Sequence, residues 1–187
     1  GVEEAVRSAM AAPQGPIILV DVADNAGGGA PADGTTILAE LLDQSASNAV
    51  VVIQDIQAVR IAKALGVGGM FSGNVGGKSD DLHGPPVPLV GSIIFQQAVR
   101  YERRGDYMTG QQIDLGEVAV IQAGGVTVML TEAKAMPFDA DHLGAAEIVA
   151  ERQQIIVVKS AIAWQAHFRA FAKGEIYVDT PGVCASN

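Results

Sequence analysis

Short continuous apolar runs alternate along the chain with stretches whose apolar residues recur at helical spacing. Such runs are typical of strands buried on both faces of a parallel sheet, and the helical spacing predicts amphipathic helices. The predicted strands are 17–20, 49–53, 69–75, 155–158 and 175–178. The predicted helices are 2–12, 35–42, 56–65, 139–151 and 161–172, with Asp33 as the expected N-cap of the second. The alternation predicts an α/β fold.

The middle of the chain departs from this alternation. Prolines between 85 and 88 are incompatible with a helix, and strand-like stretches follow them. Further along, two β-rich runs flank Gly124-Gly125, a pattern that predicts an antiparallel hairpin. We therefore expect one α/β domain over 1–187, with a mostly parallel open sheet, flanking helices and an antiparallel β insertion at about 85–132.

Composition and charge narrow the classes of function. Twenty-one acidic and 12 basic residues give a formal net charge of −9, and 5% of residues are aromatic. Such a chain repels phosphate backbones and offers few rings for base stacking, so nucleic acid is not an expected partner. No apolar run is long enough to cross a membrane, and the first residues do not resemble a signal peptide. The single cysteine permits no intrachain disulfide, and we expect a cytoplasmic protein.

Polar residues and glycines follow the carboxyl ends of the predicted strands. In an open parallel sheet these ends share one edge, and ligands bind in the crevice outside it. We therefore expect a binding site for a substrate or a small anion at this edge. Its candidate residues are Asp21, Asp24, Asn25, Gly27, Gly28, Gly29, Lys78, Lys159, Ser160 and Thr180.

The segment 21–29 has two interpretations. Asp and Asn suit turns because their side chains bond nearby backbone amides, so a plain strand-to-helix connection is one of them. Three consecutive glycines exceed what a turn needs, and their N–H groups could converge on an anion at the start of the next helix. The segment lacks the G-x-G-x-x-G pattern of a dinucleotide site.

The segment 72–79 nearly matches the phosphate loop of nucleotide hydrolases. It reads Ser-Gly-Asn-Val-Gly-Gly-Lys-Ser, with Ser72 where that pattern requires glycine. The residues after it do not predict the helix whose dipole such a loop uses. A surface turn is the alternative to a ligand-binding role for Lys78.

Lys159 directly follows an apolar run, so its ammonium group must pair with an acid or reach solvent. A structural salt bridge with Asp21 or Asp179 is the alternative to ligand binding.

The three histidines do not have the spacing of a metal site. We expect His83 in a loop, His142 solvated at the start of a helix and His167 on the last helix. Trp164 is expected in the core or in an interface.

Short motifs recur in order from about residue 17 to the end of the chain. They are Asp-Val-Ala-Asp-Asn-Ala-Gly-Gly-Gly at 21–29, Gly-Gly-Lys at 76–78, His-Gly-Pro-Pro at 83–86, Gly-Gly-Val-Thr-Val at 124–128, Pro-Phe-Asp at 137–139, Val-Val-Lys-Ser at 157–160 and Tyr-Val-Asp-Thr-Pro-Gly-Val at 177–183. Together and in this order they resemble the C-terminal domain of the microcystinase C (MlrC) family.

The resemblance implies a fragment of a longer protein. Members of the family are zinc-dependent metallopeptidases or hydrolases of small peptides, with their zinc ligands in an N-terminal domain. It therefore implies zinc in the full-length protein and none in this chain, and no catalytic residue can be carried onto it. The N-terminal zinc domain and a small peptide or amide substrate are the implied partners. This chain would be an accessory domain that forms one wall of the cleft, inactive alone, with the glycine loop and Lys159-Ser160 facing the zinc domain.

Two other interpretations stay open. The chain could be a stand-alone module that binds a small anion or a phosphate compound. It could also be a structural or oligomerisation domain, whose strand-end polar residues pair with one another and leave no cleft. A homo-oligomer is compatible with each interpretation.

Overall fold

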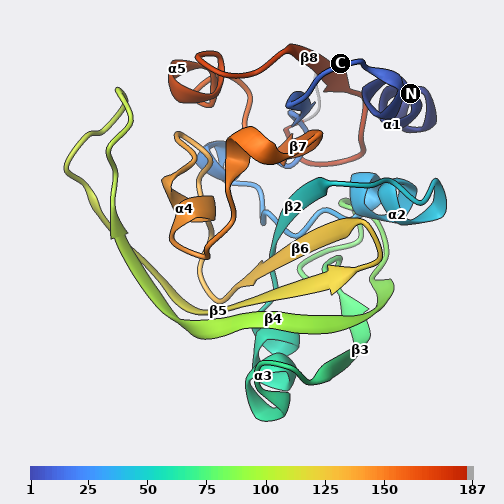
Figure 1. Cartoon of the computed structure of the whole chain (residues 1–187), viewed down its shortest axis with the longest axis vertical. Helices are drawn as coiled ribbons and strands as arrows, with labels where there is room; N and C mark the ends of the chain where they lie inside the picture. Colours follow the sequence, from blue (N-terminus) through green and yellow to red (C-terminus); the bar gives the residue numbers. More distant parts are fainter. Residues whose placement is uncertain (185–187) are drawn as a thin grey trace.

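The computed structural model describes residues 1–184 as one eight-stranded sheet with helices on both faces (Figure 1). In sheet order the strands are β3 (Met70–Val75), β4 (Val87–Glu102), β5 (Gln112–Ala123), β6 (Val126–Thr131), β2 (Ala49–Gln54), β7 (Ile155–Val158), β1 (Ile17–Asp21) and β8 (Gly174–Val178). The helices are α1 (Val2–Ala11), α2 (Thr36–Asp43), α3 (Ile56–Leu65), α4 (Asp141–Gly144) and α5 (Gln165–Phe168), with 3₁₀ turns η1 (Ala26–Gly28) and η2 (Ala150–Arg152).

The sheet has a parallel and an antiparallel portion. Strands β6, β2, β7, β1 and β8 are parallel to their neighbours, whereas β3, β4, β5 and β6 form an antiparallel meander. The predicted hairpin is confirmed, because Ala123 pairs with Val126 across the Gly124-Gly125 turn. The predicted α/β sheet, parallel with an antiparallel portion in mid-chain, is therefore confirmed.

Successive residues of each central strand point to opposite faces and build two cores. In β1, Ile17 and Leu19 pack toward α1, α2 and α3, while Ile18 and Val20 pack toward the segments around α4 and α5. Trp164 is fully buried in the second core, as expected. This burial on both faces explains why the central parallel strands β1, β2 and β7 read as apolar runs. Within residues 1–184, no helix has both the length and the apolar character to cross a bilayer.

The strand predicted at 69–75 exists, but it does not belong to the parallel portion. Among residues 1–184, strand β3 pairs only with β4, in the antiparallel sense, at one end of the sheet. The antiparallel portion therefore begins at Met70, earlier than the prolines that suggested it. Strand β4 pairs with β5 along one edge, and its other edge pairs with β3.

Two predicted helices are much shorter than their patterns suggested. Of 139–151 only Asp141–Gly144 is α-helical, and Glu147 adopts a positive φ of 63° that ends any continuation. Of 161–172 only Gln165–Phe168 is helical, with turns on either side. The helical spacing of these apolar residues reflects burial against the sheet, which short turns achieve as well as a long helix.

The expected N-cap of α2 is also wrong. The N-cap position belongs to Thr35, and no side chain caps this helix. The Asp33 carboxylate instead accepts hydrogen bonds from the backbone N–H groups of Lys78 and Ser79, both at 2.9 Å. A loop 45 residues away in sequence thus competes successfully for this carboxylate.

Candidate functional site

The candidate site lies at the carboxyl edge of the parallel strands. Strand β1 ends at Asp21, β2 is followed by Asp55, β7 by Lys159 and β8 by Asp179. Because β2, β7, β1 and β8 are parallel neighbours, these ends meet at the same edge. Two groups of interacting side chains form there, one around Lys159 and one around Asp55.

Lys159 is buried, and its ammonium group contacts three acceptors. Its Nζ lies 2.8 Å from Asp24 Oδ2 and 3.5 Å from Asp21 Oδ2, and it donates to the carbonyl of Gly34 at 2.8 Å. Burial alone would lower the pKa of Lys159, but attraction to Asp21 and Asp24 outweighs it and raises the pKa above its usual value. Lys159 is therefore a cation whose N–H donors all have partners within the domain. Its partners include Asp21, as the salt-bridge alternative predicted, and Asp24 in place of Asp179.

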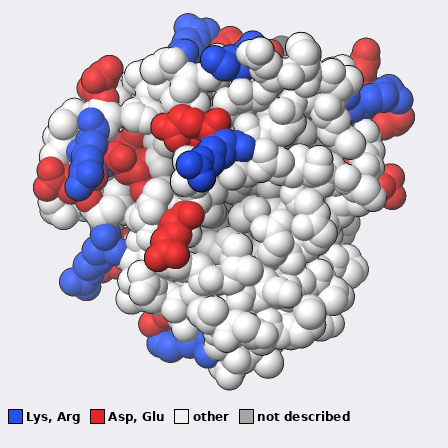
Figure 2. Space-filling model, viewed as in Figure 1, with Lys and Arg blue, Asp and Glu red and all other residues white. Residues whose placement is uncertain are grey.

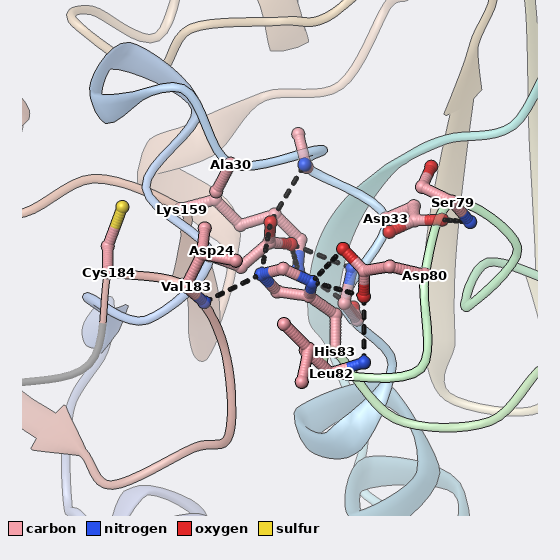
Figure 3. Close-up of polar contacts among 12 residues, drawn as sticks. Asp24, Ala30, Asp33, Ser79, Asp80, Leu82, His83, Lys159, Val183 and Cys184 are labelled. Carbon is pink, nitrogen blue, oxygen red and sulfur yellow. Dashed lines mark hydrogen bonds and ion pairs between the residues drawn. The ribbon is translucent and has the colours of Figure 1, made fainter.

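Asp24 folds the glycine-rich loop back onto the end of β1. Its Oδ1 accepts from the N–H of Ala32 and its Oδ2 from the N–H of Gly34, both at 2.7 Å. A Cβ atom at Gly34 would lie 2.7 Å from Asp24 Oδ2, so only glycine permits this approach. Figure 3 shows Asp24 and Lys159 facing one another at the centre of the site. This carboxylate holds both ends of the segment 24–34 in place.

Two further segments join this group. Thr180 Oγ1 donates to Asp21 Oδ1 at 2.6 Å, which ties the end of β8 to the end of β1. The N–H of Val183 donates to His83 Nε2 at 3.2 Å, and His83 Nδ1 bonds Asp80 Oδ1 at 2.8 Å. The hydrogen bond from His83 lowers the pKa of Asp80. His83 is thus a buried link between two loops (Figure 3).

The second group forms around Asp55. Its Oδ1 caps α3 by accepting from the N–H groups of Gln57 and Ala58, and its Oδ2 accepts from the N–H of Gly76 at 2.8 Å and from Lys78 Nζ at 2.7 Å. Lys78 therefore lies in this neighbouring group, away from Lys159. The segment after Lys78 contains no helix, which removes the phosphate-loop interpretation.

The candidate residues divide into a buried and an exposed set. Asp21, Asp24, Lys159, Ser160 and Thr180 are each at most 6% exposed. In contrast, Gly27, Gly28 and Gly29 are exposed and Asn25 is half-buried. The sequence predicts ligand binding by both sets, whereas the structure brings the buried set together beneath the exposed one.

A groove of about 480 Å³ adjoins the glycine loop at Gly27. Tyr107 packs edge-on against Phe138 in its wall, with ring centroids 5.1 Å apart. Lys134, also in the wall, donates from Nζ to the carbonyl of Ala30 at 2.7 Å. The exposed side of the loop therefore borders a hollow with aromatic, amide and lysine groups.

The sequence does not reveal the buried positions of His83 and His142. His83 was expected to be an ordinary loop residue, and only its packing against residues far along the chain reveals its role. His142 was expected to be solvated but is 2% exposed, with Nδ1 bonded to the carbonyl of Asp139 at 2.9 Å. Burial lowers the pKa of His142 to about 4, so this imidazole is neutral at pH 7.

Comparisons with known proteins place these features in a family. The family model described as the MlrC C-terminus matches residues 19–187. Microcystinase C of Sphingomonas sp is 29% identical over 174 residues, which are 92% of this chain and 34% of that protein. A crystal structure described as a "putative metallopeptidase" from Mesorhizobium sp. BNC1 has a TM-score of 0.91 and 28% identity, and the match covers 99% of this chain and 37% of that one.

The chain spans about a third of the length of these two relatives. The match to the family model includes the glycine loop, the lysine after β7 and the turn after β8. This agrees with the resemblance carried by the sequence motifs. The chain belongs to the MlrC C-terminus family.

Proposed function

We propose that this domain is the accessory C-terminal part of a zinc-dependent metallopeptidase or amide hydrolase of small peptides, and that its exposed glycine loop forms one wall of the active-site cleft. Family membership and the names of the two relatives support the hydrolase class. The chain spans about a third of those relatives, and in this proposal the opposite wall belongs to the remaining part of the longer protein.

The observation that carries this proposal is that the buried network around Lys159 holds an exposed glycine loop in place. It fixes the loop 24–34 from below, through Asp24, while leaving Gly27, Gly28 and Gly29 exposed. The N–H groups of Gly28 and Gly29 bond within the loop, whereas the N–H of Gly27 has no acceptor among residues 1–184. In this proposal the Gly27 N–H and the Asn25 amide contact the substrate.

Lys159 has a positioning role in this proposal. Since its donors already bind Asp21, Asp24 and Gly34, it offers none to a substrate carboxylate or a developing oxyanion. With its two carboxylate partners it carries a net negative charge, which also disfavours an anion. Thr180 and Ser160, buried beside it, belong to the same supporting layer.

The described residues of this chain do not fit a metal centre. In residues 1–184, no group of three His, Cys, Asp or Glu side chains lies close enough together to hold an ion. The buried carboxylates of the site already accept hydrogen bonds from Lys159, Thr180 and backbone N–H groups. The zinc of this proposal would therefore be held by the part of the longer protein outside this chain, and no hydrolytic step is assigned to residues here.

The test measures amide hydrolysis by the full-length protein carrying Gly27→Ala or Asn25→Ala. A methyl group at Gly27 would lie 3.4 Å from Phe138 Cε1, an ordinary contact, so the fold should tolerate it. Asn25→Ala removes the contacting amide, and Gly27→Ala adds a methyl group beside the contacting N–H. We therefore expect kcat/KM to fall about tenfold or more, a loss of about 1.4 kcal/mol of transition-state stabilisation, with little change in melting temperature. Gly144→Ala is the matched control, because nothing lies within 4 Å of its new methyl group.

The outcome also separates this proposal from a purely structural role. Mutual pairing of the buried residues is what a structural domain would show as well, so only the exposed residues distinguish the two. Wild-type rates for both Gly27→Ala and Asn25→Ala would remove the glycine loop from the cleft and favour the structural role.

A further inference from the structure

The ladder between the central strands β2 and β7 ends before the strands do. They pair at Ala49 with Ile155 and at Val50 with Ile156, although both strands continue beyond these residues. After β2 the chain enters α3, which packs in the core shared with α1 and α2, and after β7 it enters α5, which packs in the opposite core. Connections that leave adjacent parallel strands toward opposite faces of a sheet open a crevice between them. The split between β2 and β7 is such a crevice.

The backbone groups of Val52 in β2 point into this split. The N–H of Gln54 donates to the carbonyl of Ala32, and the N–H of Asp55 donates to the carbonyl of Thr131 in β6, both at 3.0 Å. Gln54 therefore turns its backbone groups away from β6. Because this direction alternates along a strand, the N–H and carbonyl of Val52 also point away from β6, toward β7.

The backbone N–H of Lys159 lies on the other side of the split. The N–H of Ile155 donates to the carbonyl of Asn48, just before β2, so the backbone groups of Ile155, and by alternation those of Lys159, face β2. In a parallel ladder the next bond would run from the N–H of Lys159 to the carbonyl of Val52. This bond is not formed, and the backbone N–H of Lys159 has no acceptor among residues 1–184.

A small cavity lies between these groups. Its volume is about 10 Å³, and its lining includes Val52 and Gln54 on one side, Val157 and Lys159 on the other, and His142. A cavity needs roughly 10–15 Å³ to hold a water molecule, so this one has room for a single water and for nothing larger.

His142 adds a third polar group to the lining. Its Nδ1 bonds the carbonyl of Asp139 at 2.9 Å, so in the neutral imidazole Nδ1 carries the proton and Nε2 carries a lone pair. The cavity therefore has one donor, the backbone N–H of Lys159, and two acceptors, the carbonyl of Val52 and His142 Nε2.

We propose that one water molecule occupies this cavity, accepts a hydrogen bond from the backbone N–H of Lys159, and donates to the carbonyl of Val52 and to His142 Nε2. Three hydrogen bonds are typical of a buried water. The water takes the place of the missing ladder bond and joins β2 to the residue that follows β7. Because the carbonyl of Lys159 accepts from the N–H of Ala26 at 3.1 Å, this water also supports the base of the glycine loop.

Water fits these partners better than an ion does. Charged side chains of this chain commonly reach solvent, as Figure 2 shows for one face, whereas Lys159 is 5% exposed and brings its positive charge to the crevice. A metal cation is disfavoured beside this ammonium group and the N–H donor, and an anion is disfavoured by the carbonyl and the imidazole lone pair. A water molecule both donates and accepts, so it satisfies all three groups.

A crystal structure of this chain, at a resolution that shows ordered water, tests the proposal directly. We expect one peak of density within about 2.7–3.2 Å of the Lys159 backbone nitrogen, the Val52 carbonyl oxygen and His142 Nε2. A cavity without density, in a map that shows ordered water elsewhere in the protein interior, would overturn the proposal. A peak too strong for water would overturn it as well.

Two substitutions of equal size at Ala135 test the polarity of the cavity in solution. Ala135 lines the cavity and is 6% exposed, so a larger side chain there displaces the water. Threonine and valine have the same shape, but only the threonine hydroxyl can bond the groups that the water leaves. We expect Ala135→Thr to have a melting temperature roughly 2–4 °C above that of Ala135→Val.

The same pair of substitutions at the exposed Ala133 is the matched control and should show no such difference. In an apolar cavity without water, the threonine hydroxyl would be buried unpaired and Ala135→Val would be the more stable variant. That order, or equal melting temperatures of the two Ala135 variants, would contradict the proposed water site.

Discussion

His142 shows how burial of a single polar side chain in this domain changes its protonation. Its Nδ1 donates to the carbonyl of Asp139, whose carboxylate pairs with Arg103 at 3.1 Å. Removal from water disfavours the charged imidazole, the carbonyl partly offsets this, and the Arg103 charge opposes protonation further. The pKa of His142 is thereby lowered to about 4 from the ordinary 6.5.

This lowered pKa predicts a loss of stability in mild acid. Between pH 6.5 and 4 the unfolded chain binds a proton at this position and the folded chain does not, so stability falls as pH falls through this window. The full loss is on the order of 3 kcal/mol, reached near pH 4, and none of it is present above pH 7.

Urea unfolding at pH 7, 5.5 and 4 measures this loss, with His142→Gln as the comparison. The glutamine amide can still donate to the Asp139 carbonyl but does not titrate, so the variant should lose less stability than the wild type over the same range. Equal losses in the two proteins would show that His142 does not contribute.

At the scale of elements, turns and caps decide where strands and helices end. The Gly124-Gly125 turn closes the β5–β6 hairpin, with Gly124 at a positive φ of 58°. Gly125 has an ordinary φ but lies against the backbone of Ala46 and Ser47. The two glycines therefore serve different purposes, one conformational and one steric.

Substitutions at these glycines should separate the two purposes. Gly125→Ala should destabilise by up to about 3 kcal/mol, because its methyl group meets backbone atoms that cannot move aside easily. Gly124→Asn should change stability by no more than about 0.5 kcal/mol, since asparagine tolerates the left-handed region and the position is open. Chemical denaturation compares them, and a Gly125→Ala variant as stable as Gly124→Asn would contradict this assignment.

At the scale of the whole molecule, the network around Lys159 joins segments that are far apart in the chain. Asp21, Asp24 and Gly34 come from the first quarter of the sequence, Lys159 and Thr180 from the last. The N–H of Ala26 also donates to the carbonyl of Lys159 at 3.1 Å. Loss of the Lys159 side chain therefore removes contacts between the segment 21–34 and the end of β7.

Lys159→Met should destabilise the domain by about 3–5 kcal/mol, because it leaves Asp21 and Asp24 buried beside each other without a cation. Lys63→Met is the control. Lys63 pairs with Glu117 at 2.6 Å with its side chain 55% exposed, so its loss should cost at most about 1 kcal/mol. Unfolding curves at one fixed protein concentration measure both. Similar effects of the two substitutions would contradict a central role for the buried network.

The sequence predicted the regular elements well where burial alone determined them. The central parallel strands β1, β2 and β7 read as apolar runs because both of their faces are covered, and the Gly-Gly turn was recognisable from local chemistry. The helix predictions at 139–151 and 161–172 were wrong, because apolar residues there, such as Trp164 and Phe168, pack on the sheet from short turns. Hydrophobic spacing indicates which side chains are buried, but it does not distinguish a helix from successive turns.

For the site, the sequence by itself determined that polar groups gather at one edge, because parallel strands end on the same side of a sheet. Only the tertiary structure decided which of these groups pair with each other. Lys159 pairs with Asp24 in place of Asp179, and the Asp33 carboxylate accepts hydrogen bonds from a distant loop in place of capping α2. The buried His83 imidazole bonds the backbone N–H of Val183. Partners that are far apart in sequence and depend on loop paths leave no local pattern, whereas strand direction does.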